Sequence, residues 1–268
     1  MPGHVVLVPP DPSPADGATA LASGIARVRI GNPDKLNALD IAMWRQLRTV
    51  FEALNADPRP PRAVVVEGEG GTFVSGGDIG EFPHFRFQAE SLRAFHEDAV
   101  APALRAMLAC DIPLLAQIEG PCVGGGLEIA ACCDIRICGR SSRFGIPIAR
   151  LGFPLAPLEA EIVARVLPLP LLRELLIEAR LLTAEQALQH GIVQRVVDDA
   201  QVAAEAQASA ERIAALSPQA LRLNKRLLRQ MAAGPLTAAQ RAPLYDYADS
   251  AEHREGLAAF LDKRPPRF

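Results

Sequence analysis

The pattern of apolar and polar positions divides the chain into two parts. Up to about residue 198, short apolar runs typical of strands alternate with helical patterns and with loops rich in glycine and proline. From Asp199 onward no strand pattern occurs, and helical patterns alone follow over residues 200–216, 218–231, 237–248 and 250–261. Strands that alternate with helices are typical of an α/β protein. We therefore predict an α/β core over residues 1–198 and a helical region over residues 199–268.

The apolar runs of the core predict six strands, several of them rich in β-branched residues. They cover residues 5–8, 25–30, 63–67, 114–118, 135–137 and 192–197. Between the first two strands, Pro9–Gly17 contains proline and aspartate and is expected to be a loose hairpin or a mobile loop. Ser141–Gly152 is predicted to be a second loop.

The helical patterns of the core begin at recognisable caps. They cover residues 40–55, 90–108, 127–133, 158–167, 171–178 and 183–191. Asp40 and Thr183 stand where N-caps are expected. The first helix carries an apolar stripe at helical spacing, which predicts its buried face: Trp44, Leu47, Val50, Phe51 and Leu54.

The segment Gln117–Asp134 reads as the end of a buried strand, a glycine turn and then a helix. Gly124, Gly125 and Gly126 have no side chains, so their backbone can adopt positive φ and bring N–H groups close to a ligand. The following helix is apolar on every face except at Glu128, and such a helix is normally buried. The segment therefore combines free backbone donors with a carboxylate within one turn of them.

Glu128 allows two interpretations, because a buried carboxylate costs several kcal/mol unless it is hydrogen-bonded, paired or neutralised. One is a structural ion pair with Arg136, Arg150 or another arginine. The other is a general acid or base with a raised pKa, beside backbone donors that could hold a developing negative charge. The local sequence does not decide between them.

A second strand leads into glycines at Gly68–Ile79. Gly76 and Gly77 leave their N–H groups free, while Asp78 is predicted to cap a short turn. Two strand–glycine–helix turns in one chain could face each other across a pocket. A pair of backbone donors from separate loops is the physical form of an oxyanion hole.

Composition restricts the partners. The 268 residues are 49% hydrophobic and 22% charged, with a formal charge of −3, so the chain has no basic footprint for nucleic acid or for an anionic membrane. No charge-free apolar run is long enough for a membrane span, and the N-terminus shows no secretory signal. We expect a cytoplasmic protein.

The sequence shows no metal motif. Five cysteines lie mostly in apolar runs and are predicted to be small buried thiols: Cys110, Cys122, Cys132, Cys133 and Cys138. Their spacing matches no zinc pattern. His84 and His96 lack a partner motif, so we predict that each is solvated or structural.

Six segments, in order along nearly the whole chain, resemble the crotonase, or enoyl-CoA hydratase/isomerase, superfamily. They are Asn32–Leu39 (NPDKLNAL), Phe73–Ile79 (FVSGGDI), Ile118–Asp134, Phe144–Gly145, Leu182–Ala187 with Gly191–Val193, and the tail Glu255–Phe268. The resemblance implies a crotonase-like spiral of β-β-α units with a C-terminal helical region that forms trimers, commonly paired as hexamers.

The same resemblance implies a coenzyme A thioester as substrate and no separate cofactor. The N–H groups of Gly77 and Gly125 correspond to the oxyanion-hole donors, and Glu128 to the first of two catalytic glutamates of the hydratases. Phe260 and Lys263 resemble residues that close the acyl pocket and contact the CoA. The full set of implied substrate-binding residues is Lys35, Leu36, Gly76, Asp78, Ile79, Gly124, Ile148, Phe260 and Lys263.

The sequence also departs from the hydratase pattern. The second catalytic glutamate of the hydratases corresponds to Ile148, so the pair of carboxylates that would hold a water molecule is incomplete there. Glu159 or Glu161 on the next helix could reach the pocket, but we favour solvated helix charges for both. A hydratase lysine shortly after Asp78 is absent, since Gly80 and Glu81 stand there.

Three functions remain open at this point. The first is an enoyl-CoA hydratase or isomerase in which Glu128 transfers the proton. The second is another enolate reaction on CoA thioesters, such as decarboxylation or thioester hydrolysis. The third is a protein that binds acyl-CoA without turnover, which Ile148 favours and the buried Glu128 disfavours. We favour the first.

Overall fold

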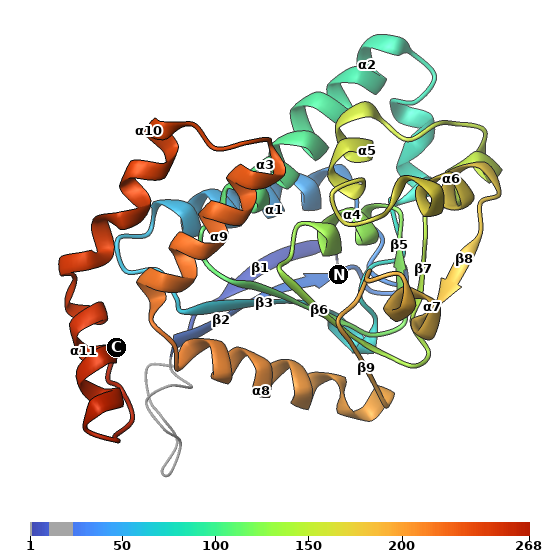
Figure 1. Cartoon of the computed structure of the whole chain (residues 1–268). Coiled ribbons are helices and arrows are strands. Elements are labelled where there is room, and N and C mark those ends of the chain that lie inside the picture. The colour runs from blue at the N-terminus through green and yellow to red at the C-terminus, as the bar shows by residue number, and fades with distance from the viewer. Residues whose placement is uncertain (1, 11–23) are drawn as a thin grey trace.

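Six strands form the central sheet (Figure 1). A computed structural model describes residues 2–10 and 24–268 of the protein. In spatial order the strands are β1 (His4–Val8), β2 (Ile25–Gly31), β3 (Ala63–Gly68), β4 (Leu114–Ile118), β6 (Ile135–Gly139) and β9 (Arg195–Val197). β1 pairs antiparallel with β2, and all other neighbours are parallel. The six predicted strands are thereby confirmed, while residues 11–17 of the predicted connector lie outside the described residues.

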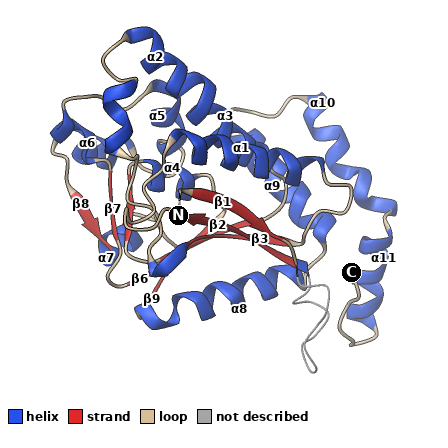
Figure 2. Cartoon of the chain, turned by 180° about the vertical axis from the view of Figure 1, so that it is seen from behind, coloured by secondary structure: helices blue, strands red, loops and turns tan. Residues whose placement is uncertain are grey.

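Helices cover both faces of this sheet, which explains its apolar strands. Val64 and Val66 of β3 face a core shared with α1 (Ile41–Ala56) and α3 (Ala101–Ala109). Val65 points the opposite way, to a smaller core built with α8 (Val202–Ala214). Figures 1 and 2 show α8 alone beneath the sheet and the other two helices above it.

The first helix has the predicted cap and the predicted buried face. The Asp40 carboxylate accepts a hydrogen bond from the Met43 N–H at 2.7 Å. Trp44, Leu47, Phe51 and Leu54 are buried, as their spacing predicts, while Val50 is partly buried against the same core. The helix is therefore held against the sheet along its whole length.

The helical pattern predicted over residues 90–108 forms three successive segments. α2 (Ala89–Ala94) passes into a π-helical turn, η4 (Phe95–Val100), and then into α3. A π-helical turn inserts a residue relative to the α-helix and often occurs at functional sites. Here it carries Phe95 and His96.

A second, three-stranded sheet stands beside the first. It contains β5 (Pro121–Val123), β7 (Arg143–Gly145) and β8 (Leu181–Thr183). The prediction of an uninterrupted loop over Ser141–Gly152 was wrong, because β7 and the 3-10 turn η5 (Pro147–Leu151) lie within it. Each of these strands has only three residues and, unlike β9, none was marked by a longer strand pattern in the sequence.

The remaining helices surround the two sheets. They are η2 (Glu69–Gly71), η3 (Ile79–His84), α4 (Gly125–Ala131), α5 (Pro157–Val163), α6 (Leu169–Ile177), α7 (Ala184–Gln189), η6 (Asp199–Gln201), α9 (Pro218–Ala232), α10 (Ala238–Arg241), η7 (Ala242–Asp249) and α11 (Ala251–Leu261). Thr183 and Gln186 form a capping box at the start of α7. Helices α9 to α11 lie at the end of the molecule opposite the small sheet (Figures 1 and 2). Among the described helices, no apolar segment has the length that a bilayer span requires.

The parallel pairing of β3 and β4 sets the position of the two glycine loops. Because parallel strands end at the same edge of a sheet, the loop after β3 and the loop after β4 emerge side by side. Val74 bridges Cys122, with N–H···O distances of 3.1 Å from Val74 to Pro121 and from Val123 to Val74. The five cysteines are all buried, as predicted.

Candidate active site

Two glycine loops come together at the start of α4. A Cβ atom built on Gly124 would lie 3.7 Å from the Cα atom of Gly76, so the two backbones are in direct contact. Gly76 and Gly124 have φ angles of 121° and 52°, which side-chain-bearing residues rarely adopt. Within the described part of the chain, neither the Gly77 N–H nor the Gly125 N–H donates a hydrogen bond. Both glycines line one cavity, so two unpaired donors are available there.

The position of the Gly125 N–H is fixed by close packing. A Cβ atom on Gly125 would lie 2.9 Å from Cζ2 of Trp44, and one on Gly126 would lie 2.4 Å from the carbonyl oxygen of Val74. The first turn of α4 therefore rests directly on the loop that carries Gly77. A side chain at Gly126 would push the two loops apart, and one at Gly125 would collide with Trp44 and Leu39.

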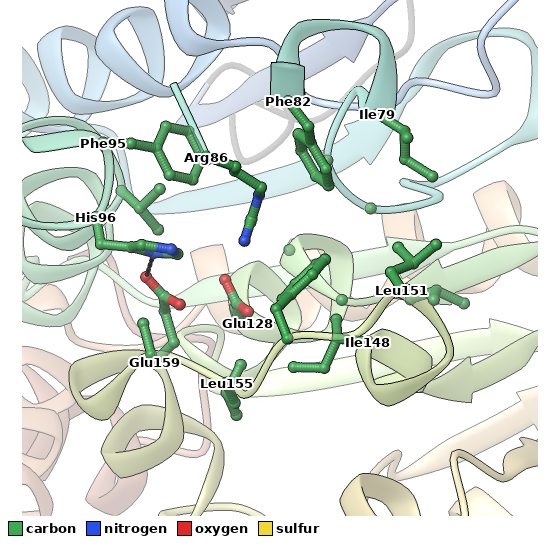
Figure 3. A pocket seen from close by; sticks show the side chains of 18 of the residues that line it. Ile79, Phe82, Arg86, Phe95, His96, Glu128, Ile148, Leu151, Leu155 and Glu159 are labelled. Atoms are coloured by element: carbon green, nitrogen blue, oxygen red, sulfur yellow. Dashed lines mark hydrogen bonds and ion pairs between the residues drawn. The ribbon is translucent and has the colours of Figure 1, made fainter. Parts of the chain in front are cut away.

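The cavity beside these donors has a volume of about 180 Å³. This is small compared with the ~300–1,000 Å³ typical of pockets for whole ligands of drug size. Most of its wall is apolar and includes Ile79 and Ile148. Its ionisable side chains are Arg86, His96, Glu128 and Glu159 (Figure 3).

Glu128 enters the cavity from α4 and is only 5% exposed. Burial raises its pKa well above the ordinary value, and the neighbouring Glu159 raises it further, while Arg86 acts in the opposite direction. The interpretation as an ion pair with Arg136 or Arg150 is wrong. Arg136 donates to the carbonyl groups of Cys133 and Ile192, and Arg150 donates to that of Ala179 at 2.8 Å.

Glu159 also lies in the cavity, so the prediction of a solvated charge was wrong for this residue. It is 3% exposed and belongs to the first turn of α5. Glu159, Ile162 and Val163 are the buried residues of that helix, at the i, i+3 and i+4 spacing of a single helical face. Glu161 points the other way and is exposed, as predicted.

His96 is the partner of Glu159, a contact that the sequence did not predict, and whether the histidine is structural or catalytic stays a prediction. Its Nδ1 atom lies 2.8 Å from Oε1 of Glu159. The two residues come from η4 and α5, so their contact is visible only in the folded chain (Figure 3). His84 is exposed, as predicted.

Arg86 is the ionisable residue that the sequence reasoning missed. Its guanidinium carbon lies 4.1 Å from the ring centre of Phe82 and 3.9 Å from that of Phe153, and these two rings meet edge to face at 75°. Burial lowers its pKa, whereas the nearby Glu159 and Glu128 raise it. The sequence signal that could have identified Arg86 as a site residue is its position within the phenylalanine-rich stretch Phe82–Phe87.

The other predicted site residues divide into two groups. Gly76, Ile79, Gly124 and Ile148 line the cavity. Lys35 and Asp78 do not line it; they pair with each other at 2.6 Å, and Asp78 also caps η3 by accepting from the Gly80 N–H at 3.0 Å.

The remaining three predicted residues lie on the surface. Leu36 is 61% exposed and Phe260 is 82% exposed. Lys263 is exposed at the end of α11, and neither it nor Phe260 lines the cavity. Contacts of these residues with CoA stay predictions. Among the described residues, no group of three or more histidine, cysteine or carboxylate side chains is arranged to hold a metal ion.

Comparisons with known proteins agree with this architecture. A family model described as enoyl-CoA hydratase/isomerase matches residues 20–268. A Thermus thermophilus protein whose name assigns it to the enoyl-CoA hydratases is 31% identical over 256 residues, which cover 91% of this chain and 97% of that protein. The human enoyl-CoA hydratase domain-containing protein 3, a mitochondrial protein, is 29% identical over 250 residues, covering 91% of this chain and 80% of that protein.

A solved structure shows the same fold at higher identity. It is that of an enoyl-CoA hydratase/carnithine racemase from Magnetospirillum magneticum, with 39% identity and a TM-score of 0.88. The match covers 91% of this chain and 92% of that one.

Proposed function

Because the chain belongs to the enoyl-CoA hydratase/isomerase family, we propose that it adds water to the double bond of an α,β-unsaturated acyl-CoA thioester. The observation that carries the proposal is the presence of Glu128 and Glu159 in one cavity beside two free N–H donors. Hydration requires a base for the water, an acid for the α-carbon and a site for the negative charge of the enolate. These residues supply all three.

The N–H groups of Gly77 and Gly125 would bind the thioester oxygen. In the enolate this oxygen carries the negative charge, so the donors bind the transition state more strongly than the substrate. One such donor is worth about 3 kcal/mol of transition-state stabilisation. The close packing beneath Gly125 and Gly126 keeps the donor fixed, so no reorganisation is needed during the reaction.

The two carboxylates would divide the proton transfers between them. The raised pKa of Glu128 keeps this residue protonated, so it serves as the acid. Glu159 is held by His96 and serves as the base that removes a proton from water. The water oxygen bonds to the β-carbon, the double-bond electrons move into the thioester enolate, and the α-carbon takes the proton of Glu128. The proton gained by Glu159 returns to Glu128 before the next turnover.

In this assignment, Glu159 replaces the second catalytic carboxylate of the hydratases, which is absent here because residue 148 is isoleucine. It is tested by following the absorbance of the conjugated thioester for a panel of short enoyl-CoA compounds and identifying the 3-hydroxyacyl product. Glu128→Gln and Glu159→Gln should each lower the rate by about 10²–10⁴-fold, the usual contribution of a positioned acid or base. Glu161→Gln changes an exposed residue of the same helix and should leave the rate unchanged.

Three outcomes would reject the proposal in different ways. A double-bond shift without water addition would make the protein an isomerase. Release of free thiol or carbon dioxide would indicate a hydrolase or decarboxylase. Binding of enoyl-CoA without any turnover, in wild type and variants alike, would indicate an acyl-CoA-binding protein.

We also propose that the C-terminal helices form a homotrimer, or a hexamer of two trimers. Their surface carries large exposed apolar side chains, among them Leu228, Met231, Tyr245, Leu257 and Leu261. Such patches are typical of association surfaces. Phe260 and Lys263 would then contact the CoA of a neighbouring subunit. Sedimentation equilibrium measures the assembly directly, and a monomer at micromolar concentration would reject it.

A further inference from the structure

Arg86 has no role in the hydration chemistry proposed above, yet it lies in the same cavity. Its guanidinium group points into the space between His96 and Glu128 (Figure 3). Within the described residues it forms no ion pair, and its buried Nε–H has no hydrogen-bond acceptor. Leaving a buried donor unpaired is costly, and more so for a charged group. Structural requirements alone do not account for an arginine here.

The aromatic rings of Phe82 and Phe153, which meet edge to face at 75°, contact the guanidinium group on two adjoining sides. Arginine is suited to such contacts because its charge is delocalised over a planar group. The terminal nitrogens of the group are directed toward the cavity (Figure 3). Their N–H donors match the two oxygens of a carboxylate.

Neither carboxylate of the cavity is paired with Arg86. Glu159 is hydrogen-bonded to Nδ1 of His96 at 2.8 Å instead, and burial raises the pKa of Glu128, which favours its neutral form. Arg86 keeps its positive charge at neutral pH. Within the described residues, its guanidinium group is therefore a cation without an ion-pair partner.

From this juxtaposition we propose that Arg86 binds a carboxylate at the end of a short acyl chain. The substrate class is then an enoyl-CoA thioester of a dicarboxylic acid. The inference rests on the proposed hydration, since it assumes that the thioester lies between Gly77 and Gly125. The volume of about 180 Å³ suits a short chain, and Arg86 and both glycines line this one cavity, so the chain spans from the donors to the guanidinium group.

The test compares pairs of substrates that differ only in the chain end. Fumaryl-CoA, glutaconyl-CoA and 2-hexenedioyl-CoA carry a carboxylate where crotonyl-CoA, 2-pentenoyl-CoA and 2-hexenoyl-CoA carry a methyl group. We expect kcat/KM for the best carboxylate-ended compound to exceed that of its methyl-ended partner by about tenfold or more, because hydrogen bonds to charged groups are the strong ones.

Substitutions of Arg86 should change the ratio of kcat/KM between a carboxylate-ended substrate and its methyl-ended partner. Arg86→Met should remove the preference, and Arg86→Lys should keep part of it because lysine retains the charge but not the planar fork. Arg93→Met is the matched control, since Arg93 is exposed on α2 and does not line the cavity. Competitive inhibition of wild type by glutaryl-CoA and by pentanoyl-CoA needs no variant, and glutaryl-CoA should bind about tenfold more tightly.

The outcomes separate this inference from the proposed function. Hydration of the methyl-ended compounds at equal or better rates, with equal inhibition by the two saturated thioesters, overturns the role of Arg86 and leaves the hydratase intact. An Arg86→Met variant that loses activity equally on both substrate types would make Arg86 a counter-ion of Glu128 and Glu159. Absence of water addition to all six compounds would reject the proposed function itself.

Discussion

Replacing Glu128 by glutamine should make the protein more stable than wild type, and increasingly so as the pH rises. Glutamine keeps the size of the side chain and removes the ionisable group. In the folded protein, burial and the neighbouring Glu159 raise the pKa of Glu128 well above its ordinary value of 4.5. In the unfolded chain the same carboxyl group titrates near that ordinary value. The folded state therefore holds a proton that the unfolded state loses.

The size of the effect follows from this single proton. Between the two pKa values the folded state binds one proton more than the unfolded state, so the stability of wild type falls by about 1.4 kcal/mol per pH unit. The stability that protonated Glu128 contributes is fully present below the pKa of this residue in the unfolded chain. It is lost as the pH rises through the pKa of Glu128 in the folded protein. Glutamine does not titrate, so the stability of the variant relative to wild type rises with the same slope. In melting temperature the slope is about 3–6 °C per pH unit for a chain of this size.

The assay is thermal or urea unfolding of both proteins without ligand, at fixed protein concentration, between pH 5 and 8. Glu161→Gln, which changes an exposed residue of the same helix as Glu159, serves as the control for replacing a glutamate by glutamine. In a Glu159→Gln background, the Glu159 carboxylate no longer raises the pKa of Glu128. The stability gained by adding Glu128→Gln should therefore stop increasing at a lower pH. A difference between the Glu128 variant and wild type that stays flat over this range would refute the reasoning, because Glu128 would then be ionised and unable to act as the acid.

Three further substitutions test close packing and ion pairing in the fold. Gly126→Ala brings a methyl group against a backbone oxygen at 2.4 Å, and it should cost about 1–3 kcal/mol in urea unfolding and lower hydration by about 100-fold. Gly256→Ala lies in α11 with space for the methyl group, and calorimetry should show stabilisation by about 0.5–1 kcal/mol. Lys225→Met removes the 2.7 Å ion pair with Asp134, and urea unfolding should show a loss of about 1–3 kcal/mol.

Elements governed by local chemistry were predicted from the sequence. The β-branched run of β3 and the cap at Asp40 depend on residues that are adjacent in the chain. Asp78 caps η3 for the same reason. From the sequence, the two glycine loops could face each other across a pocket. Their contact follows from the parallel pairing of β3 and β4, which the structure shows.

The acid and base groups around Glu128 were not predicted, because they depend on contacts between distant segments. His96 and Glu159 are 63 residues apart and meet only when α5 folds over η4. A π-helical turn cannot be read from a pattern with a period of 3.6, so the direction of the His96 side chain could not be predicted. The burial of Glu159 could be predicted in part, because Glu159 shares a helical face with Ile162 and Val163.

The isoleucine at position 148 and the carboxylate at position 159 are explained by one electrostatic argument. A cavity of this size with Glu128 already in it becomes more costly with each added negative charge, because like charges in apolar surroundings raise each other's pKa. With Glu159 supplied from α5 and held by His96, a further glutamate at position 148 would leave the cavity with three carboxyl groups against two basic side chains. An apolar residue there instead deepens the burial of Glu128, which is the condition for its protonation. The loss of one carboxylate from the usual position is therefore compatible with hydration, because the chemistry depends on where the groups lie in the cavity and not on which helix or loop provides them.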